Sequence, residues 1–154
     1  MPALWVANSS PLIVFERLGQ TNLLQAVIER LYIPPAVRRE VFGADFIPQW
    51  IEEHPLTQPV PRRVATARVD AGEREAIALA LELGATWLLI DDLRGRRLAQ
   101  AVGLNIVGSA GYLLRAKDKG LIPAVRPLLE AMRGVRSRIS DRVFAKILAA
   151  AGES

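Results

Sequence analysis

The chain has 154 residues, of which 51% are hydrophobic, and this is enough material for one domain with a packed core over residues 1–154. It has no cysteine, which excludes disulfides, thiolate nucleophiles and zinc–thiolate centres, and its single histidine, His54, argues against a Ser-His-Asp triad or a poly-histidine metal site. No apolar run approaches the roughly 20 residues of a membrane span and the N-terminus lacks a signal pattern, so we expect no membrane partner and a cytoplasmic protein.

The charge of the chain favours an anionic partner. The formal net charge is +4, and arginine far outnumbers lysine, which occurs only at Lys117, Lys119 and Lys146. Arginine is the preferred side chain for bidentate phosphate contacts, so the composition favours a nucleic-acid partner. A second interpretation stays open at this point, because arginine-rich composition also follows from a GC-rich genome and charged faces are usually only solvated.

Strand and helix signals alternate along the first third of the chain. Asn8-Ser9-Ser10-Pro11 is predicted to end a strand and to start a helix, with Ser10 as its cap and Pro11 at the first helical position. The elements expected before residue 43 are a strand from Leu4 to Ala7, helices from Pro11 to Leu18 and from Asn22 to Arg30, a strand from Leu31 to Ile33, and a helix from Pro35 to Phe42. Residues 43–63 are rich in proline and predicted to be irregular, with a short helix around Trp50 and a strand near Val60.

The most informative segment is Gly72 to Asp92, which reads GEREAIALALELGATWLLIDD. At 100° per residue, the apolar residues of its first half form one helical stripe, and Glu73 lies at the centre of this stripe while Glu75 and Glu82 point the opposite way. A carboxylate on the core-facing side is costly unless something pairs with it. The alternative is ordinary capping, since an acid in the first turn also interacts favourably with the helix dipole.

The rest of the chain continues the alternation. The expected elements are a strand from Trp87 to Ile90, a helix from Arg94 to Val102, a strand from Leu104 to Val107, and helices from Ala110 to Lys119, from Ala124 to Met132 and from Asp141 to Ala150, the last capped by Ser140. This order predicts an α/β protein with a parallel sheet and helices on both faces. Asn8, Asp91 and Asp92 follow strands, and Glu40 and Glu73 lie on helices that flank them. We therefore expect these residues to meet at the carboxyl edge of the sheet, where ligands bind in open α/β folds.

The chain resembles the PIN-domain proteins, in the branch of VapC-like toxins and related nucleic-acid-binding proteins. The similarity is carried by ANSSPLI, by IPPAVRREV, by the segment from AGEREAIALALELG to LRAKDKGLIP, and by the C-terminal SDRVFAKILAAAGE, which together cover nearly the whole chain. The resemblance implies a three-layer α/β/α fold with a central, mostly parallel sheet. It also implies a ribonuclease that uses Mg²⁺ or Mn²⁺ for phosphodiester hydrolysis.

The same resemblance assigns roles to individual residues. The four acidic catalytic positions of the family fall on Asn8, Glu40, Glu73 and Asp91, the metal ligands on Glu40, Glu73, Asp91 and Asp92, and the hydroxyl partner of the first acid on Ser10. Because Arg94, Arg96 and Arg97 directly follow the acids, we expect them, with Ser10, to contact the RNA backbone. A solvated helix face is the alternative for these arginines.

Asn8 departs from the family pattern, which has aspartate at this position. An amide offers a hard cation an oxygen but no negative charge, so Asn8 is expected to weaken metal binding and cleavage. Two hypotheses follow. The first is a metal-dependent endoribonuclease that acts as the toxin of a toxin–antitoxin pair, as a homodimer that binds a small antitoxin protein. The second is a catalytically impaired PIN-like module that binds RNA or a protein.

Overall fold

In the computed structural model, which describes residues 2–135 and 139–154, five parallel strands form one sheet in the order β3-β2-β1-β4-β5. The strands are β1 (Trp5–Ala7), β2 (Leu31–Ile33), β3 (Ile51–Glu53), β4 (Trp87–Leu89) and β5 (Ile106–Val107). The central strands are buried on both faces and are short apolar runs, as expected for a parallel sheet covered by helices. The predicted α/β fold with a parallel sheet is confirmed.

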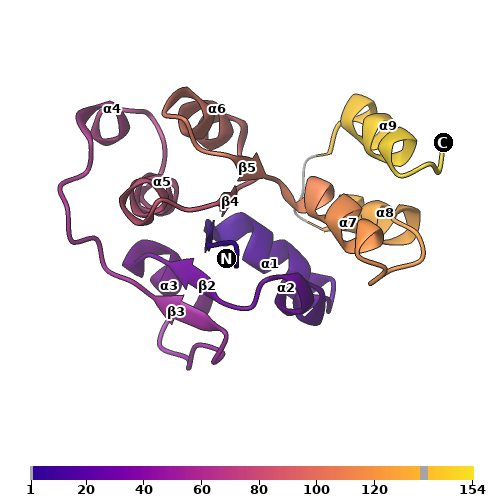
Figure 1. Cartoon of the computed structure of the whole chain (residues 1–154), viewed down its shortest axis with the longest axis horizontal. Helices are drawn as coiled ribbons and strands as arrows, with labels where there is room; N and C mark the ends of the chain where they lie inside the picture. The colour runs from indigo at the N-terminus through magenta and orange to yellow at the C-terminus, as the bar shows by residue number, and fades with distance from the viewer. Residues whose placement is uncertain (1, 136–138) are drawn as a thin grey trace.

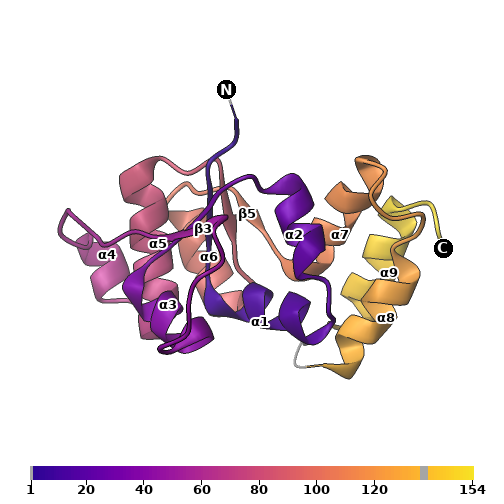
Figure 2. The same ribbon diagram turned by 90° about the horizontal axis from the view of Figure 1, so that it is seen from below.

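Helices cover both faces of this sheet, which gives three layers (Figures 1 and 2). In Figure 2, α3, α4 and α5 lie on one side of the strands, and α2, α7, α8 and α9 lie on the other. The helices are α1 (Ser9–Arg17), α2 (Thr21–Val27), α3 (Pro35–Phe42), α4 (Arg62–Ala65), α5 (Ala71–Leu83), α6 (Leu93–Ala101), α7 (Ser109–Asp118), α8 (Arg126–Gly134) and α9 (Asp141–Ala150).

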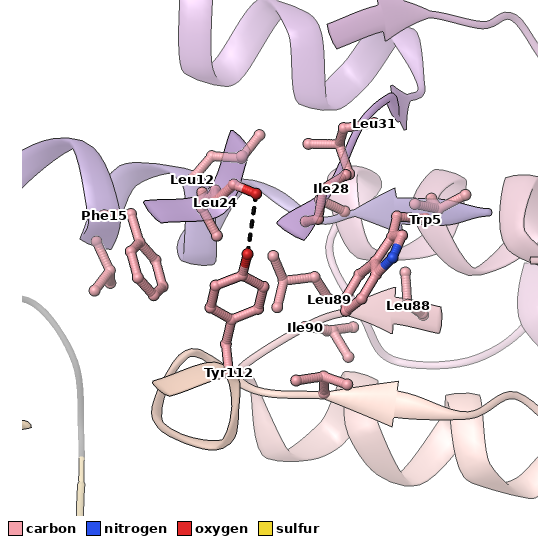
Figure 3. Close-up of a cluster of buried hydrophobic side chains, with 14 of the residues drawn as sticks. Trp5, Leu12, Phe15, Leu24, Ile28, Leu31, Leu88, Leu89, Ile90 and Tyr112 are labelled. Carbon is pink, nitrogen blue, oxygen red and sulfur yellow. Dashed lines mark hydrogen bonds between the residues drawn. The ribbon is translucent and has the colours of Figure 1, made fainter. Parts of the chain in front are cut away.

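One buried apolar cluster connects the layers (Figure 3). It includes the completely buried residues Phe15 of α1, Leu24 of α2, Leu88 of β4 and Tyr112 of α7. The Tyr112 hydroxyl donates to the carbonyl oxygens of Leu23 (2.9 Å) and Leu24 (3.0 Å), so the polar end of this buried ring is satisfied. Tyr112 therefore joins α7 to the C-terminal turn of α2.

The predicted helix around Trp50 and the predicted strand near Val60 are wrong. Trp50 is buried directly before β3, and its carbonyl accepts a hydrogen bond of 2.9 Å from Leu31 N. This segment therefore leads into the outermost strand of the sheet. Val60 lies between Pro59 and Pro61. Proline has no N–H for a ladder, which prevents a strand there, and Pro61 instead precedes α4.

The start of the first helix also differs from the prediction. Asn8, with extended φ and ψ of −82° and 174°, occupies the N-cap position, and Ser9 is the first helical residue. The prediction of Ser10 as the cap is therefore wrong by two positions. Pro11 fits the first turn of the helix because the N–H groups of that turn have no intrahelical acceptor in any case.

Candidate active site

The site lies at the carboxyl edge of the sheet, between its two central strands. β1 and β4 are neighbours with Ala7 opposite Leu89, and Asn8 N donates to Leu89 O over 2.9 Å. From β1 the chain winds outward to β2 and β3, and it returns at β4 to wind the other way. Asn8 and Asp91 therefore flank the point where the winding reverses, which is the place where doubly wound sheets form a ligand crevice.

Asn8 and Glu40 are brought together by α1 and α3. Asn8 is buried, at 5% exposed, and its side chain forms no hydrogen bond with any residue that the structure describes. The next residue, Ser9, donates from its hydroxyl to Glu40 Oε1 over 2.8 Å. This bond holds the Glu40 carboxylate against the start of α1 and leaves its second oxygen available to the solvent side.

Gly72, in the first turn of α5, faces the same oxygens. A Cβ atom placed on Gly72 would lie 2.9 Å from Glu40 Oε1, 3.3 Å from Asn8 Oδ1 and 3.5 Å from Asp70 Oδ1. All three oxygens therefore lie close to the position that a side chain at residue 72 would occupy. A pocket of about 430 Å³ opens here and is lined by Ala36, Arg39, Glu40, Asp70, Ala71 and Gly72.

Glu73 occupies the core-facing position that its helical phase predicted, at 4% exposed. It forms a capping box with Asp70: Glu73 N donates to Asp70 Oδ1 (2.7 Å), and Asp70 N donates to Glu73 Oε1 (3.1 Å). The other oxygen, Oε2, is buried and has no hydrogen-bond partner among the described residues. Glu73 thus uses Oε1 to cap α5, while Oε2 remains for a candidate site. The sequence had left capping and a site as alternatives.

The environment of Glu73 Oε2 disfavours its charge. A Cβ atom on Gly95 would lie only 2.6 Å from this oxygen, so α6 presses against it. Burial, with further contributions from the neighbouring carboxylates of Asp92 and Asp70, raises the pKa of Glu73 to about 7. The side chain of Asp92 also caps α6 by accepting from the backbone N–H groups of Arg94 and Gly95.

Asp91 is held by the start of α7. Ser109 donates to it twice, from its backbone N–H to Oδ1 over 2.7 Å and from its hydroxyl to Oδ2 over 2.6 Å. Burial raises the pKa of Asp91, while the two Ser109 bonds and the charge of Arg96 act in the opposite direction. Asp91 is therefore a fixed carboxylate that directly precedes Asp92 in the chain, and both of its oxygens are already engaged by Ser109.

The residues expected to contact substrate separate into two groups. Arg94 and Arg97 are exposed on α6, whereas Arg96 is half-buried and donates to Ile90 O over 3.0 Å. Arg96 thus binds the backbone directly before Asp91. Ser10 is half-buried in the first turn of α1, and the hydroxyl that bonds to an acid of the site belongs to Ser9.

The donors at this edge suit a hard divalent cation. No three His, Cys, Asp or Glu side chains in residues 2–135 and 139–154 are grouped closely enough to form a metal-ion cage. Mg²⁺, however, is often bound by one or two carboxylates and keeps several waters. Glu40 with Asp70, and Glu73 with Asp92, provide such carboxylate pairs, and the unpartnered Glu73 Oε2 is an oxygen that a cation would satisfy.

Three residues of this edge were not predicted: Ser9, Asp70 and Ser109. Asp70 could have been predicted, since Asp70-x-x-Glu73 is a capping-box pattern that places both side chains at one helix start. Ser109 could also have been predicted, because it follows β5, the strand next to the β4 strand that precedes Asp91. Ser9 had none, since its role depends on how α1 meets α3.

These features define a doubly wound, parallel α/β protein with an acidic site at the switch point of its sheet. The sequence model of DUF3368, a family described as a PIN domain, matches residues 4–153, and the chain belongs to this PIN-domain family. A search of the curated proteins gave no match. PIN domains are nuclease-type modules that typically bind nucleic acid and generally use divalent metals. No helix in the described part of the chain is long and apolar enough to cross a membrane.

Proposed function

We propose that this protein is a metal-dependent endoribonuclease of the PIN type. The observation that carries the proposal is the buried Glu73 carboxylate at the switch point, one oxygen of which has no partner among the described residues. Burying such an oxygen costs free energy, and a bound cation would recover it. The family membership supports the same conclusion, because PIN domains are nuclease-type modules.

In this proposal, Glu40, Glu73, Asp91 and Asp92 hold Mg²⁺ or Mn²⁺, and Asn8 contributes its amide oxygen. A bound divalent ion supplies a water of lowered pKa and stabilises the charge that develops on the phosphate. The protein positions its donors in advance: Ser9 fixes the Glu40 carboxylate and Ser109 fixes the Asp91 carboxylate. Without the ion, burial raises the pKa of Glu73 to about 7, so a cation at Oε2 would compete with a proton near neutral pH.

RNA is the proposed substrate, and the arginines near the site are its proposed contacts. Arg94 and Arg97 extend into solvent from α6, next to Asp92. Ser10 and Arg96 belong to the proposed substrate side as well, although Arg96 also bonds to the backbone at Ile90. The net charge of +4 offsets the local negative charge of the acids and favours approach of a polyanion.

We further propose that the protein acts in the cytoplasm as the toxin of a type II toxin–antitoxin pair, as a homodimer. The antitoxin would place a basic side chain across the acidic pocket and so compete with metal and substrate. The apolar stripe of Val143, Ile147 and Ala150 on α9 is the proposed contact for a partner or second copy. Val143 (43% exposed) and Ala150 face solvent, whereas Ile147 is half-buried against the core.

A second function is favoured by one specific residue, Asn8. With an amide at the first acidic position, the chain would bind RNA or a protein partner without cutting it. The two functions differ in whether the chain turns over RNA in the presence of metal.

An RNA-cleavage assay with Mg²⁺ or Mn²⁺, with EDTA as the metal-free reference, separates these functions. We expect weak cleavage or none by the natural chain and stronger cleavage by Asn8→Asp, with Glu40→Gln in the Asn8→Asp background as the inactive control. Equal, robust cleavage by both forms would show that Asn8 is no handicap. Absence of cleavage by both, with RNA retained in a gel-shift assay, would favour the binding module.

The assembly is tested separately. Light scattering at micromolar concentration should give the mass of a dimer, and a strictly monomeric mass would contradict the homodimer. Co-expression with the product of the neighbouring gene should give a complex at low salt. Failure of that product to bind would remove the toxin role and leave the nuclease proposal in place.

A further inference from the structure

A group of exposed arginines lies on α4, on the loop that follows it and on α6. We call this group the α4–α6 arginine surface, and its members are Arg62, Arg63, Arg68, Arg94 and Arg97. None of them forms an ion pair with a residue that the structure describes, and the ion pairs found there all join other segments. The sequence accounts for this difference, because no Asp or Glu occurs in residues 54–69 or in residues 93–117.

The acids of the helix between these two segments do not neutralise the surface either. α5 has three of them. Glu73 is buried, Glu75 accepts a hydrogen bond from the start of α3, and Glu82 accepts bonds from the backbone before α4. Asp70 and Asp92, at the carboxyl edge of the sheet, are the acids next to the surface in the chain. The arginines therefore form a region of positive charge with acids at one end.

α4 and α6 are held in neighbouring positions. Both pack against α5, and both lie beside it in Figures 1 and 2. Arg63 Nη1 also donates to the carbonyl oxygen of Ala101, the last residue of α6, over 3.3 Å. The arginines of the two segments therefore belong to one part of the molecule, although about 30 residues separate them in the chain.

A half-buried arginine of α5, Arg74, fixes the loop that follows α4. Its guanidinium donates to the carbonyl oxygens of Ala67 (2.9 Å) and Val69 (3.1 Å), which lie on either side of Arg68. Arg74 has no carboxylate partner among the described residues, so it adds a further positive charge beneath the loop. Arg68 is therefore presented from an anchored backbone.

The position and composition of the surface favour a phosphate backbone as its partner. Arg68 lies two residues before Asp70, and Arg94 lies two residues after Asp92, so the surface begins at the acidic edge of the sheet. All its members are arginines, which bind phosphate in a bidentate manner. A protein interface would have an apolar centre, but Leu93 is the one exposed large hydrophobic residue on α4 or α6.

We propose that the α4–α6 arginine surface binds the backbone of an RNA strand that extends from the acidic edge over α6 and α4. This inference rests on the proposed nuclease function and deepens it, because it adds Arg62, Arg63 and Arg68 as contacts that hold the substrate away from the reacting phosphate. The acidic edge alone repels a polyanion, and the neighbouring arginines supply the attraction.

The test is the triple variant Arg62→Gln, Arg63→Gln and Arg68→Gln. Fluorescence anisotropy in EDTA, where cleavage does not contribute, measures binding of a labelled single-stranded RNA of about 20 nucleotides. At about 0.1 M salt we expect an affinity at least about tenfold lower than that of the natural chain. The slope of log K against log salt should become shallower by about 2, because each contact to a single strand contributes about 0.7.

Two further triple variants are the controls. Lys119→Gln, Arg142→Gln and Lys146→Gln together remove the same charge from exposed residues of the helical layer on the other side of the sheet. This control should bind RNA within about twofold of the natural chain, because its charges lie far from the proposed path. Lysine in place of the three arginines keeps the charge and should retain the salt dependence of the natural chain.

A double variant keeps the contact between α4 and α6. Arg62→Gln with Arg68→Gln leaves the bond from Arg63 to Ala101 in place, so it should lower RNA affinity several-fold with an unchanged melting temperature. A glutamine triple variant that binds RNA as tightly as the natural chain would overturn the inference. Equal losses in this variant and in its control on the other layer would also overturn it, because net charge alone would then explain the binding.

A labelled poly-glutamate probe tests the other class of partner. If the natural chain binds poly-glutamate through these arginines and does not bind the RNA, the partner is an acidic protein and the RNA assignment is wrong. Binding and cleavage also separate the two proposals. RNA binding that depends on the three arginines without metal-dependent cleavage would overturn the nuclease and uphold the surface, whereas cleavage and binding that are insensitive to the triple variant would do the reverse.

Discussion

Glu73 serves two purposes with the two oxygens of one carboxylate. Oε1 completes the capping box that starts α5, while Oε2 is buried against Gly95 without a hydrogen-bond partner in the part of the chain that the structure describes. Burial raises the pKa of this group to about 7, so in the metal-free protein its charge opposes folding at alkaline pH. A residue that destabilises the fold and is nevertheless buried at a switch point is typical of a functional site.

We predict that Glu73→Gln stabilises the metal-free protein at pH 8, by about 1 to 3 kcal/mol, because a buried charge is removed while the amide oxygen can still accept from Asp70 N. Chemical denaturation in EDTA measures this change. Glu75→Gln is the control on the same helix, since Glu75 Oε1 already accepts from Ala36 N over 3.0 Å. A less stable Glu73→Gln protein would mean that the Glu73 carboxylate contributes to stability without a cation.

The sequence predicted Glu73 well because helical phase is a local property. Asp91 and Asp92 could be predicted equally well, since they directly follow an apolar strand. The Ser9–Glu40 bond and the approach of Asp70 to Asn8 could not be predicted, because both depend on how α1, α3 and α5 pack around Gly72. Glu75 and Glu82 were predicted to point away from the core, yet each accepts backbone N–H bonds from a neighbouring segment.

At the scale of the elements, α7 holds an acid of the site and also packs against α2. Tyr112 of α7 is completely buried and bonds to the last turn of α2, and its ring lies edge-on to Phe15 with centroids 5.5 Å apart (Figure 3). α7 begins at Ser109, which holds Asp91. The Tyr112 contact therefore helps to fix the helix that positions an acid of the site.

Tyr112→Phe should lower the free energy of unfolding by roughly 1 to 2 kcal/mol, because the Leu23 and Leu24 carbonyls lose a buried donor. Thermal and urea denaturation measure this loss. Tyr32→Phe is the matched control, since Tyr32 is half-buried and its hydroxyl forms no hydrogen bond with the described residues. Equal effects of both substitutions would show that the Tyr112 hydroxyl does not contribute.

The sequence also predicted most helices and strands correctly. The exception is the segment of residues 43–63. Strands and helices with clear periodicity were found to within a few residues, including the Ser140 cap of α9, which accepts from Val143 N. Residues 43–63 have little periodicity and several prolines, so their path is set by tertiary contacts. β3 is paired to β2 in the sheet although only one of its three residues is buried.

At the scale of the whole molecule, hydrogen bonds of Glu153 hold the C-terminal segment against α7 and α8. Glu153 accepts from the backbone N–H groups of Val125 (2.7 Å) and Arg126 (3.0 Å), and from Lys117 Nζ (2.9 Å). These bonds hold the segment after α9 against the start of α8 and against α7. They lower the pKa of Glu153 to about 2, first through Val125 N and Arg126 N and then through Lys117.

Because the folded-state pKa of Glu153 is depressed, its contribution to stability is present above its ordinary pKa of 4.5 and is lost as the pH falls towards 2. We predict that Glu153→Gln lowers the melting temperature at pH 7 and that the difference from the natural chain disappears near pH 2. Melting curves across this range measure the effect, with Glu130→Gln on α8 as an exposed control. A difference that does not change with pH would exclude the carboxylate charge as its cause.

The central claim is that the acids at the carboxyl edge of the sheet bind a divalent cation. The most direct measurement is anomalous diffraction from crystals soaked in Mn²⁺, with data collected at the manganese absorption edge. We predict a peak at the switch point, within coordination distance of carboxylates of the proposed ligand set, Glu40, Glu73, Asp91 and Asp92. A soaked crystal with no peak among these residues would contradict the account.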